Sequence, residues 1–290
     1  MIELRDIPEV RKLVQAWHRE DASVGLVMTL GALHRGHVSL IEQARAAGCR
    51  VLATIFVNPL QFGPSEDYAV YPRSETADTE LLAAAGCDAV FLPSVETVFP
   101  RGEFSPADSR TLVTVRGITG MMDGMVRPGH FTGVATIVLK MMNIVAPDVA
   151  FFGEKDYQQY EVLRAMGEDL CHAARMVACP TIREPDGLAM SSRNAYLSDE
   201  QRAIAPGLHQ TMCEAARELR RDDVRRAGAI AEAGIARLLA LGFEKVDYLE
   251  FRDARLDLAG PGSDIADLRL YAAAWLGISQ LTDNLLVTQA

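Results

Sequence analysis

The chain has few lysines, little positive charge and none of the cysteine patterns that mark metal sites. Only four of its 29 basic residues are lysines, and its 39 acidic residues give a formal net charge of −10. This charge argues against a nucleic-acid groove or an anionic membrane surface as the main partner, but a local pocket can still bind anionic small molecules. Because arginine is the usual surface cation here, a lysine in a loop needs a specific explanation.

The five cysteines include no CxxC pair, so they indicate neither a zinc site nor a disulfide framework. The longest apolar run, residues 134–145, is interrupted by Lys140, and the first residues lack the apolar segment of a signal peptide. We therefore expect a cytoplasmic protein. A length of 290 residues and an apolar fraction of 49% favour two domains.

The first part of the chain alternates apolar strands with amphipathic helices, which predicts an α/β fold with a parallel sheet. The expected strands are residues 24–28, 51–57, 89–92, 149–152 and 176–178, with a weaker one at 111–115. After strong turn residues at 183–187, Arg/Ala/Glu-rich helices lead to strands at 245–251 and 268–276. This change predicts a second, smaller α+β domain over residues 183–290, after a first domain over residues 1–182.

The stretch from Thr29 to His37 lies where the first of these strands turns into a helix. Free backbone N–H groups and the helix dipole favour anions at such a junction, and Gly31 and Gly36 allow a ligand to approach the backbone closely. His34 and His37 would add donors on either side of the helix start. The pattern G-x-x-H-x-G-H after a strand resembles the HxGH signature of the nucleotidylyltransferase superfamily, which attacks the α-phosphate of nucleoside triphosphates.

Two further loops are expected at carboxyl ends of parallel strands, where such sheets bind ligands. Asn58 and Gln61 follow one strand, and residues 153–159 follow another with a glycine turn and a helix start. After the last strand, Met190 to Arg193 offers two serine hydroxyls and a guanidinium, groups that can bind phosphates. His209, on a predicted helix, is interpreted as a packing or surface residue.

Motifs spread along nearly the whole chain resemble the pantothenate synthetase family, which joins pantoate to β-alanine and cleaves ATP to AMP and pyrophosphate. They are residues 31–37, Phe56-Val57-Asn58-Pro59, Gln61-Phe62, Tyr71-Pro72-Arg73, Arg127-Pro128-Gly129-His130-Phe131, Phe152-Gly153-Glu154-Lys155-Asp156, Met190-Ser191-Ser192-Arg193-Asn194 and Leu281-Thr282-Asp283-Asn284. Some positions depart from the family pattern. Leu30 replaces Met, Asp123 replaces Glu, and Gln280-Leu281-Thr282 replaces Arg-Leu-Ile.

The resemblance implies a Rossmann-like nucleotide-binding domain, a C-terminal domain that acts as a lid, a homodimer, and Mg²⁺ with ATP as substrate. It implies that pantoate is held by Gln61 and Gln159, with Gln61 also near β-alanine. It further implies that ATP is bound by Leu30, Gly31, Ala32, Leu33, His34, Arg35, Gly36, His37, Gly153, Glu154, Lys155, Asp156, Ile182, Met190, Ser191, Ser192 and Arg193. The metal ligands are not indicated.

The chemistry of the two half-reactions suggests roles for three catalytic candidates. A carboxylate nucleophile carries no proton, so His34, His37 and Lys155 are expected to stabilise charge on the phosphates during adenylation. The amine of β-alanine must lose a proton before it attacks, and His37 is the candidate for that transfer. Two alternatives remain open at this point: a mononucleotide adenylyltransferase that shares HxGH, and a nucleotide-binding sensor without catalysis.

Overall fold

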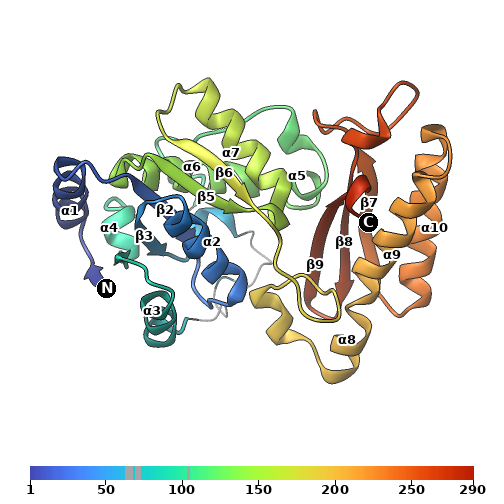
Figure 1. The fold of residues 1–290 in the computed structure, drawn as a ribbon, viewed down its shortest axis with the longest axis horizontal. Coiled ribbons are helices and arrows are strands. Elements are labelled where there is room, and N and C mark those ends of the chain that lie inside the picture. Colours follow the sequence, from blue (N-terminus) through green and yellow to red (C-terminus); the bar gives the residue numbers. More distant parts are fainter. Residues whose placement is uncertain (63–67, 69–72, 103–104) are drawn as a thin grey trace. The chain divides into compact units, whose positions relative to one another are not determined.

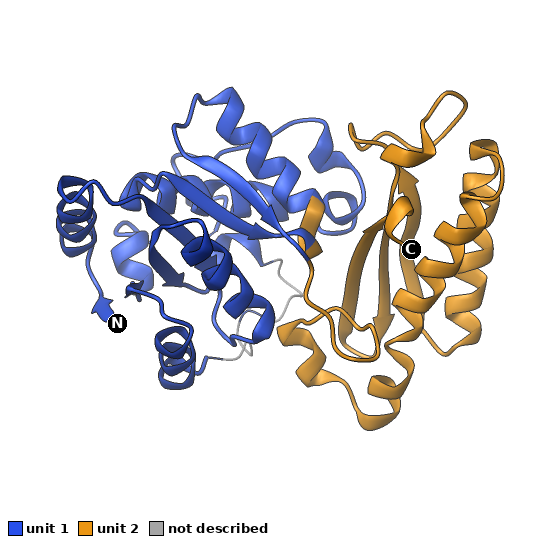
Figure 2. Ribbon diagram, viewed as in Figure 1, with its two compact units in different colours: residues 1–154, 158–180 blue, residues 155–157, 181–290 orange. Residues whose placement is uncertain are grey.

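The computed structural model describes residues 1–62, 68, 73–102 and 105–290. Tyr71 and Pro72 of the family motif lie outside this range. The chain forms two compact units, shown in Figure 2: residues 1–154 with 158–180, and residues 155–157 with 181–290. Lys155–Tyr157 lie within the first predicted domain along the chain but belong to the second unit. Each unit is described by itself.

The first unit contains a six-stranded parallel sheet in the order β1-β4-β3-β2-β5-β6 (Figure 1). Its strands are β1 (Ile2–Leu4), β2 (Val24–Thr29), β3 (Arg50–Ile55), β4 (Ala89–Phe91), β5 (Val149–Gly153) and β6 (Arg175–Cys179). Its helices are α1 (Ile7–Arg19), α2 (Arg35–Ala46), α3 (Glu75–Ala84), α4 (Val95–Val98), α5 (Asp123–Val126), α6 (His130–Val145) and α7 (Tyr157–Asp169), which starts at the last residue of the segment 155–157.

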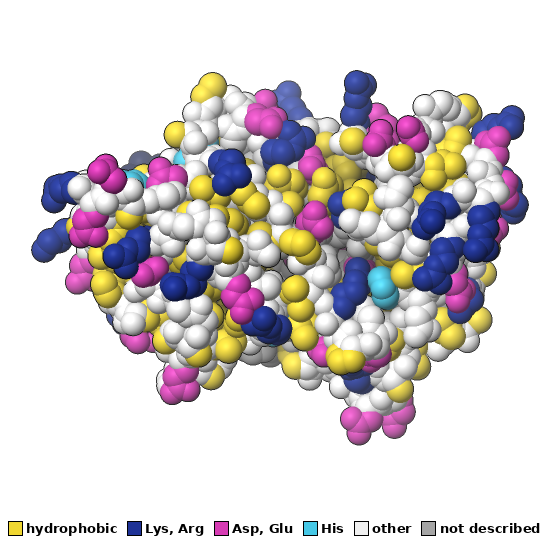
Figure 3. All heavy atoms as spheres, viewed as in Figure 1, with side chains coloured by type: hydrophobic (Ala, Val, Ile, Leu, Met, Phe, Trp, Pro, Cys, Tyr) yellow, Lys and Arg dark blue, Asp and Glu magenta, His cyan; other side chains and the backbone are white. Residues whose placement is uncertain are grey.

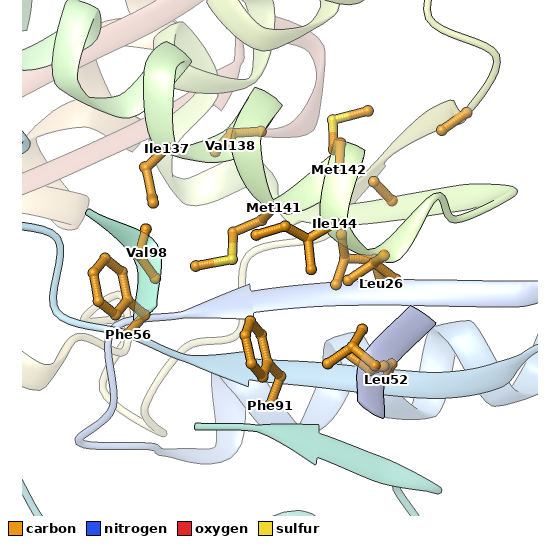
Figure 4. Packing of buried hydrophobic residues seen from close by; sticks show 14 of the residues in the cluster. Leu26, Leu52, Phe56, Phe91, Val98, Ile137, Val138, Met141, Met142 and Ile144 are labelled. Atoms are coloured by element: carbon orange, nitrogen blue, oxygen red, sulfur yellow. The ribbon is translucent and has the colours of Figure 1, made fainter. Parts of the chain in front are cut away.

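The strands are apolar on both faces because helices cover both faces. Successive residues of β2 alternate, with Leu26 in the cluster that includes α1 and α6 and Val27 in the cluster that includes α2 and α3. Figure 4 shows Met141, Met142 and Ile144 of α6 above Leu26, Leu52 and Phe91 of the sheet. This double cover explains the near-continuous apolar runs of the sequence.

The strand order reverses between β2 and β5, which makes the carboxyl ends of these strands the switch point of the sheet. Because β2 lies between β3 and β5, the turn after β2 has the end of β3 on one side and Gly153, the last residue of β5, on the other. This arrangement confirms that three predicted loops start from one edge of one parallel sheet.

The second unit packs helices against an antiparallel sheet in the order β7-β8-β9. Its strands are β7 (Lys245–Arg252), β8 (Arg269–Leu276) and β9 (Ser279–Leu286), and its helices are α8 (Asp199–Ile204), α9 (Gly207–Leu219) and α10 (Ala227–Ala240). Residues of β9 alternate, so Leu281 and Leu285 join the apolar cluster with α9 and α10. Thr282 and Asn284 consequently point to the other face of the sheet.

Several local predictions differ from the structure. Residues 111–115 form no strand; instead the backbone N–H of Val113 donates to the hydroxyl of Thr136. Ser74 is the N-cap of α3 but makes no side-chain cap hydrogen bond. Ser198 and Gln201 form a reciprocal capping box at the start of α8. Strands β1 and β9 were not predicted.

Candidate active site

The turn after β2 is a tight left-handed bend that leads directly into α2. Gly31 has φ = 90° and Ala32 has φ = 50°, a region that glycine adopts freely and alanine adopts at a cost. His34 is the N-cap of α2 in extended conformation, and His37 is in its first turn. The sequence G-x-x-H-x-G-H therefore builds a bend, a cap and a helix start in nine residues from Thr29.

The two histidines cap the helix reciprocally. Nδ1 of His34 accepts from the backbone N–H of Gly36 at 3.1 Å, and Nδ1 of His37 accepts from the backbone N–H of His34 at 3.3 Å. Their ring centroids are 4.2 Å apart. Because a ring nitrogen that accepts an N–H bond carries no proton, each neutral imidazole has its proton on Nε2. Both side chains are thus oriented as Nε2–H donors.

The backbone N–H groups of this turn differ from the sequence expectation that they would be free. Asp78 of α3, only 3% exposed, accepts from the N–H groups of Ala32 and Leu33 at 3.0 and 2.8 Å. The N–H of Gly31 donates to the hydroxyl of Thr29. These hydrogen bonds stabilise the bend itself, so the N–H groups of Gly31, Ala32 and Leu33 are already engaged within the protein.

The turn after β3 holds Gln61 from two sides. The amide Nδ2 of buried Asn58 donates to Oε1 of Gln61 at 3.1 Å and to the carbonyl of Gly133 at 3.2 Å. Nδ1 of His130 donates to the main-chain carbonyl of Gln61 at 2.9 Å. The bond from Asn58 fixes the orientation of the Gln61 amide, with Oε1 toward Asn58 and the NH₂ group on the other side.

Gly133 of α6 allows this turn to approach the helix. A Cβ at position 133 would lie 2.1 Å from the carbonyl oxygen of Leu60 and 2.7 Å from Cα of Gln61. Real Cβ atoms do not approach backbone so closely, so only glycine is compatible with this packing. Glycine inside a helix costs about 1 kcal/mol of helix propensity. Its presence at position 133 is explained because it lets Leu60 and Gln61 lie against the helix.

Beyond β5, Gly153 and Glu154 belong to the first unit, together with Gln158 and Gln159 of α7. Gln158 is buried and donates to the carbonyls of Ile118 and Met121, while its Oε1 accepts from the N–H of Asp123. It is therefore a structural clamp for the loop before α5. Its neighbour Gln159 is partly exposed.

The thiol next to β5 is inert. Burial, with a smaller contribution from the Glu154 carboxylate, raises the pKa of Cys179 to about 11. The protonated thiol is a poor nucleophile at neutral pH. We therefore do not expect Cys179 to act as a nucleophile at the carboxyl edge of the parallel sheet.

In the second unit, Lys155 is held at its side chain and at its main chain. Its Nζ donates to Oγ1 of Thr282 at 3.0 Å and to Asp156 at 3.3 Å. Its carbonyl accepts from Nδ2 of Asn284 at 2.7 Å. Lys155 thus has a fixed place on the sheet of this unit.

Backbone hydrogen bonds hold the predicted phosphate-binding loop, Met190 to Arg193, against the segment that begins at Ile182. The N–H of Met190 donates to the carbonyl of Ile182 at 3.0 Å, and Arg183 and Ala189 form a β-bridge. Ser191 caps the following 3-10 turn by accepting from the N–H of Arg193. Ser192 lies in that turn and is partly buried.

A buried ion pair anchors this loop to β9. Arg183 donates two hydrogen bonds to Asp283, at 2.6 and 2.9 Å, and the side chain of Asp283 is 2% exposed. Burial alone would raise the pKa of Asp283, but hydrogen bonds from His209 and Arg183 outweigh it and hold the pKa below its ordinary value. The Asp283 carboxylate, 3.6 Å from Nδ1 of His209, and the Cys213 thiol raise the pKa of His209 to about 9.

A cavity within the second unit brings together Lys155, the loop and β9. It is lined by Lys155, Leu188, Ala189, Ser191, Asn194, Leu208, His209, Leu281, Thr282 and Asp283. His209, interpreted from the sequence as packing or surface, is therefore a charged group on this cavity. Oδ1 of Asn194 is buried there with no hydrogen-bond partner among the described residues.

The predicted site residues thus fall into two sets. The first unit holds Leu30–His37, Gln61, Gly153, Glu154 and Gln159; the second holds Lys155, Asp156, Ile182 and Met190–Arg193. Lys155 and Ser191 line one cavity. Sequence reasoning gave no role to the supporting residues Asp78, His130, Gly133, Thr282 and Asp283. His130, Thr282 and Asp283 stand in motifs that resemble the family, and Gly133 is a glycine inside a predicted helix, whereas no signal marked Asp78.

Basic and acidic side chains are interspersed on the face of each unit shown in Figure 3.

In the described part of the chain, no group of three His, Cys, Asp or Glu residues is arranged to hold a metal ion. Among the same residues, no helix is both long and apolar enough to span a membrane.

The parallel sheet and the HxGH turn at its switch point define an α/β enzyme of the nucleotide-using HxGH class. The pattern of the pantoate-beta-alanine ligase family matches residues 3–286. The chain therefore belongs to this family.

Full-length relatives agree with this assignment. Pantothenate synthetase 3 of Frankia alni is 47% identical over 97% of this chain and 96% of its own, and pantothenate synthetase of Rhodospirillum rubrum is 48% identical over 97% of both. The crystal structure of pantothenate synthetase from Thermus thermophilus has a TM-score of 0.88 at 41% identity and covers 99% of both chains.

A structure of pantoate-beta-alanine ligase from Francisella tularensis, complexed with beta-gamma ATP and beta-alanine, has a TM-score of 0.82 at 30% identity and covers 100% of this chain and 99% of its own. The protein is an enzyme that ligates pantoate with β-alanine at the expense of ATP. This activity excludes the two alternatives left open by the sequence, a mononucleotide adenylyltransferase and a nucleotide-binding sensor without catalysis.

Proposed function

We propose that the ligation proceeds in two steps, through a pantoyl-adenylate intermediate with release of pyrophosphate and then AMP. The observation that supports this most is the pair of Nε2–H donors on His34 and His37 at the switch point. In the first step the pantoate carboxylate attacks the α-phosphorus and the bond to pyrophosphate breaks. In the second step the amine of β-alanine, which first gives up a proton to solvent, attacks the acyl carbon; the bond to the AMP oxygen breaks, AMP leaves, and the second amine proton also passes to solvent.

His34 and His37 stabilise the negative charge that develops on the phosphates. Their Nδ1 atoms accept backbone N–H bonds, which supports the donor role of Nε2. The sequence also made His37 a candidate to accept the amine proton. That role would require its proton on Nδ1 and would break the bond from the N–H of His34, so we favour the electrostatic role for both histidines.

Pantoate is held by the amides of Gln61 and Gln159, and Gln61 also lies near β-alanine. An amide binds a carboxylate or hydroxyl without cancelling the charge that makes the carboxylate a nucleophile. The hydrogen bond from Asn58 to Oε1 of Gln61 supports this role, because it directs the NH₂ group to the ligand.

ATP is bound by the residues that the family resemblance identifies. In the first unit these are Leu30–His37, Gly153 and Glu154; in the second they are Lys155, Asp156, Ile182 and Met190–Arg193. Lys155 acts as a point cation on phosphate oxygens. Its position on a cavity with Ser191, in a chain that has few lysines, supports this role.

Mg²⁺ accompanies the triphosphate. It prefers oxygen ligands and is generally held by phosphates with one or two carboxylates, and Asp156 beside Lys155 offers such a carboxylate. When bound, it would share the phosphate charge.

The homodimer and the lid role of residues 183–290 stay predictions of the resemblance. Light scattering of the purified protein tests the homodimer. Small-angle scattering profiles recorded with and without ATP and pantoate test the lid role.

Exchange of labelled pyrophosphate into ATP tests the two-step mechanism. With pantoate and Mg²⁺ present and β-alanine absent, exchange should be fast, because adenylation is complete without an amine. His37→Ala should slow it by about 100-fold, the typical cost of removing one such donor. Gln61→Ala should act mainly through pantoate affinity. Exchange that strictly requires β-alanine would overturn the mechanism, and formation of ADP would point to an acyl phosphate.

A further inference from the structure

The sheet of the second unit has two faces with different tasks. One face, which includes Leu281 and Leu285 of β9, packs in the apolar cluster with α9 and α10. The other face carries Thr282 and Asn284, and it contacts the segment Lys155–Tyr157. This segment follows the end of β5, and its first residue, Lys155, is separated from Thr282 by 127 positions.

The main chain of Lys155 is fixed by an amide whose orientation is itself fixed. Nη1 of Arg269 donates to Oδ1 of Asn284 at 2.5 Å, so the NH₂ group of Asn284 points to the carbonyl of Lys155. Arg269 and Asn284 are 6% and 4% exposed. A hydrogen bond between such buried groups is costly to break, because an unpaired polar atom would remain.

The same arginine also holds the end of the segment. Cζ of Arg269 lies 3.8 Å from the centre of the Tyr157 ring, a cation–π contact, and the ring of Tyr271 lies 6.4 Å from that of Tyr157. The carbonyl of Lys155 and the ring of Tyr157 are thereby attached to β9 and β8. What remains to be fixed is the long side chain.

The ammonium group of Lys155 is held by a neutral oxygen. Its Nζ donates to Oγ1 of Thr282 at 3.0 Å, and the side chain is 20% exposed. The carboxylate of Asp156, at 3.3 Å, is 51% exposed and contributes little in water. A hydroxyl fixes the ammonium without cancelling its charge, and one of the three N–H donors of the ammonium suffices for this bond.

We propose that Thr282 is a positioning residue that places the ammonium of Lys155 for phosphate binding. A free lysine side chain must lose rotamer freedom when it binds, and a bond that fixes it beforehand reduces that loss. The proposal rests on the catalytic role proposed above for Lys155.

The test uses Thr282→Val, which keeps the shape and removes the hydroxyl, and Thr282→Ser, which keeps the hydroxyl. In pyrophosphate exchange, Thr282→Val should lower the maximal rate by on the order of tenfold, the scale of one hydrogen bond to a charged group, with a smaller change in the KM for ATP. Thr282→Ser should restore most of the rate.

A matched control is Thr211→Val in the same unit. The hydroxyl of Thr211 is buried and has no hydrogen-bond partner among the described residues, so its removal should leave the exchange rate unchanged. A loss of rate in Thr211→Val as large as in Thr282→Val would show a general effect of Thr→Val on the unit and would overturn the proposal.

A second measurement does not depend on catalysis. With only four lysines, the acetylation rate of each can be followed by peptide mass spectrometry. Acetylation of Lys155 in the unliganded enzyme should be faster in Thr282→Val than in the wild type, while that of Lys12, Lys140 and Lys245 stays the same. Unchanged acetylation of Lys155, or an exchange rate that rises in Thr282→Val, would contradict the positioning role.

Lys155→Ala separates this proposal from the proposed function. If Lys155→Ala abolishes exchange but Thr282→Val matches the wild type, Lys155 is catalytic and the positioning role is wrong. If Lys155→Ala keeps full exchange, the catalytic role fails, and with it the proposal that its positioning matters for phosphate binding, whatever the acetylation rates.

Discussion

The two units hold their site residues in different ways. In the first unit, His34 and His37 are fixed by main-chain bonds two and three residues away. In the second unit, Lys155 and Arg183 are fixed by side chains of β9 that lie 127 and 100 positions further along the chain. The first arrangement is made by one turn, whereas the second requires the whole unit to be folded.

This difference predicts different sensitivities. The turn of the first unit depends on backbone geometry, on close packing and on backbone N–H groups that donate to the buried Asp78. The loop of the second unit depends on the buried Asp283 and on the charge state of His209. Mutations of charge at Asp283 or His209 should therefore affect the second unit, and a change of volume at Gly133 should affect the first.

The largest effect is expected for Asp283→Asn. Removing the charge leaves Arg183 without its carboxylate, and breaking a buried ion pair costs about 3–5 kcal/mol. The chain has two tryptophans, Trp17 in the first unit and Trp275 in the second, so urea unfolding of a Trp17→Phe background reports on the second unit.

Asp223→Asn is the control for this experiment. Asp223 pairs with Arg225 on the surface and caps a 3-10 turn, and Asn caps as well as Asp. The midpoint of unfolding should not change in this variant. Equal midpoints for Asp283→Asn and the wild type would mean that the ion pair does not anchor the loop.

Lys155→Arg should lower the turnover number by about 100-fold, because a planar guanidinium cannot replace a compact ammonium on phosphate and on Thr282. Steady-state pantothenate formation measures this, with thermal unfolding as the check that the variant is folded. Wild-type turnover in Lys155→Arg would show that only the positive charge at this position matters.

Gly133→Ala should destabilise the first unit by about 1–3 kcal/mol, since its Cβ would overlap the backbone of Leu60 and Gln61. It should also raise the KM for pantoate by displacing Gln61. The control is Gly228→Ala in α10, where nothing lies within 4 Å of the added Cβ; this change should be neutral or slightly stabilising. If Gly133→Ala and Gly228→Ala changed the stability and the KM for pantoate equally, the close contact of Gly133 with Leu60 and Gln61 would not be the cause.

The smallest effect is a pH dependence of the second unit. The pKa of His209 is raised in the folded state from 6.5 to about 9, so its stabilising contribution is complete below pH 6.5 and is lost as the pH rises through about 9. After allowance for partial exposure, this is on the order of 1 kcal/mol, or about 2–4 °C in Tm. His209→Gln should flatten the Tm profile between pH 6.5 and 9; an unchanged slope would exclude His209 as its origin.

The fold of the first unit was largely predictable because its signals are local and periodic. Apolar runs marked β2 and β3, and the helix start at the HxGH turn marked α2. The exceptions have physical reasons. β1 has only three residues. Residues 111–115 alternate in polarity but form no strand, and the backbone N–H of Val113 donates to Thr136 of α6. β9 was missed because Thr282, Asp283 and Asn284 interrupt its apolar pattern.

The position of a candidate residue in the fold was predictable where it follows a strand end, as with His34, His37 and Asn58. It was not predictable where a residue acts through a distant partner. Asp78 reaches the turn of Ala32 and Leu33 from 46 and 45 positions away, and no local pattern marks it. Such contacts follow from the folded arrangement and carry no signature in the nearby sequence.

The grouping of Lys155–Tyr157 with residues 181–290 has a consequence for how this enzyme could be divided or recombined. A fragment that ends at Pro180 would carry Lys155 but lack Arg269, Thr282 and Asn284, to which the lysine and its neighbours are attached. A chimera joined at that point would combine the lysine of one parent with the sheet of another. Residue 282 and the segment 155–157 should therefore be inherited together, although they are far apart in the gene.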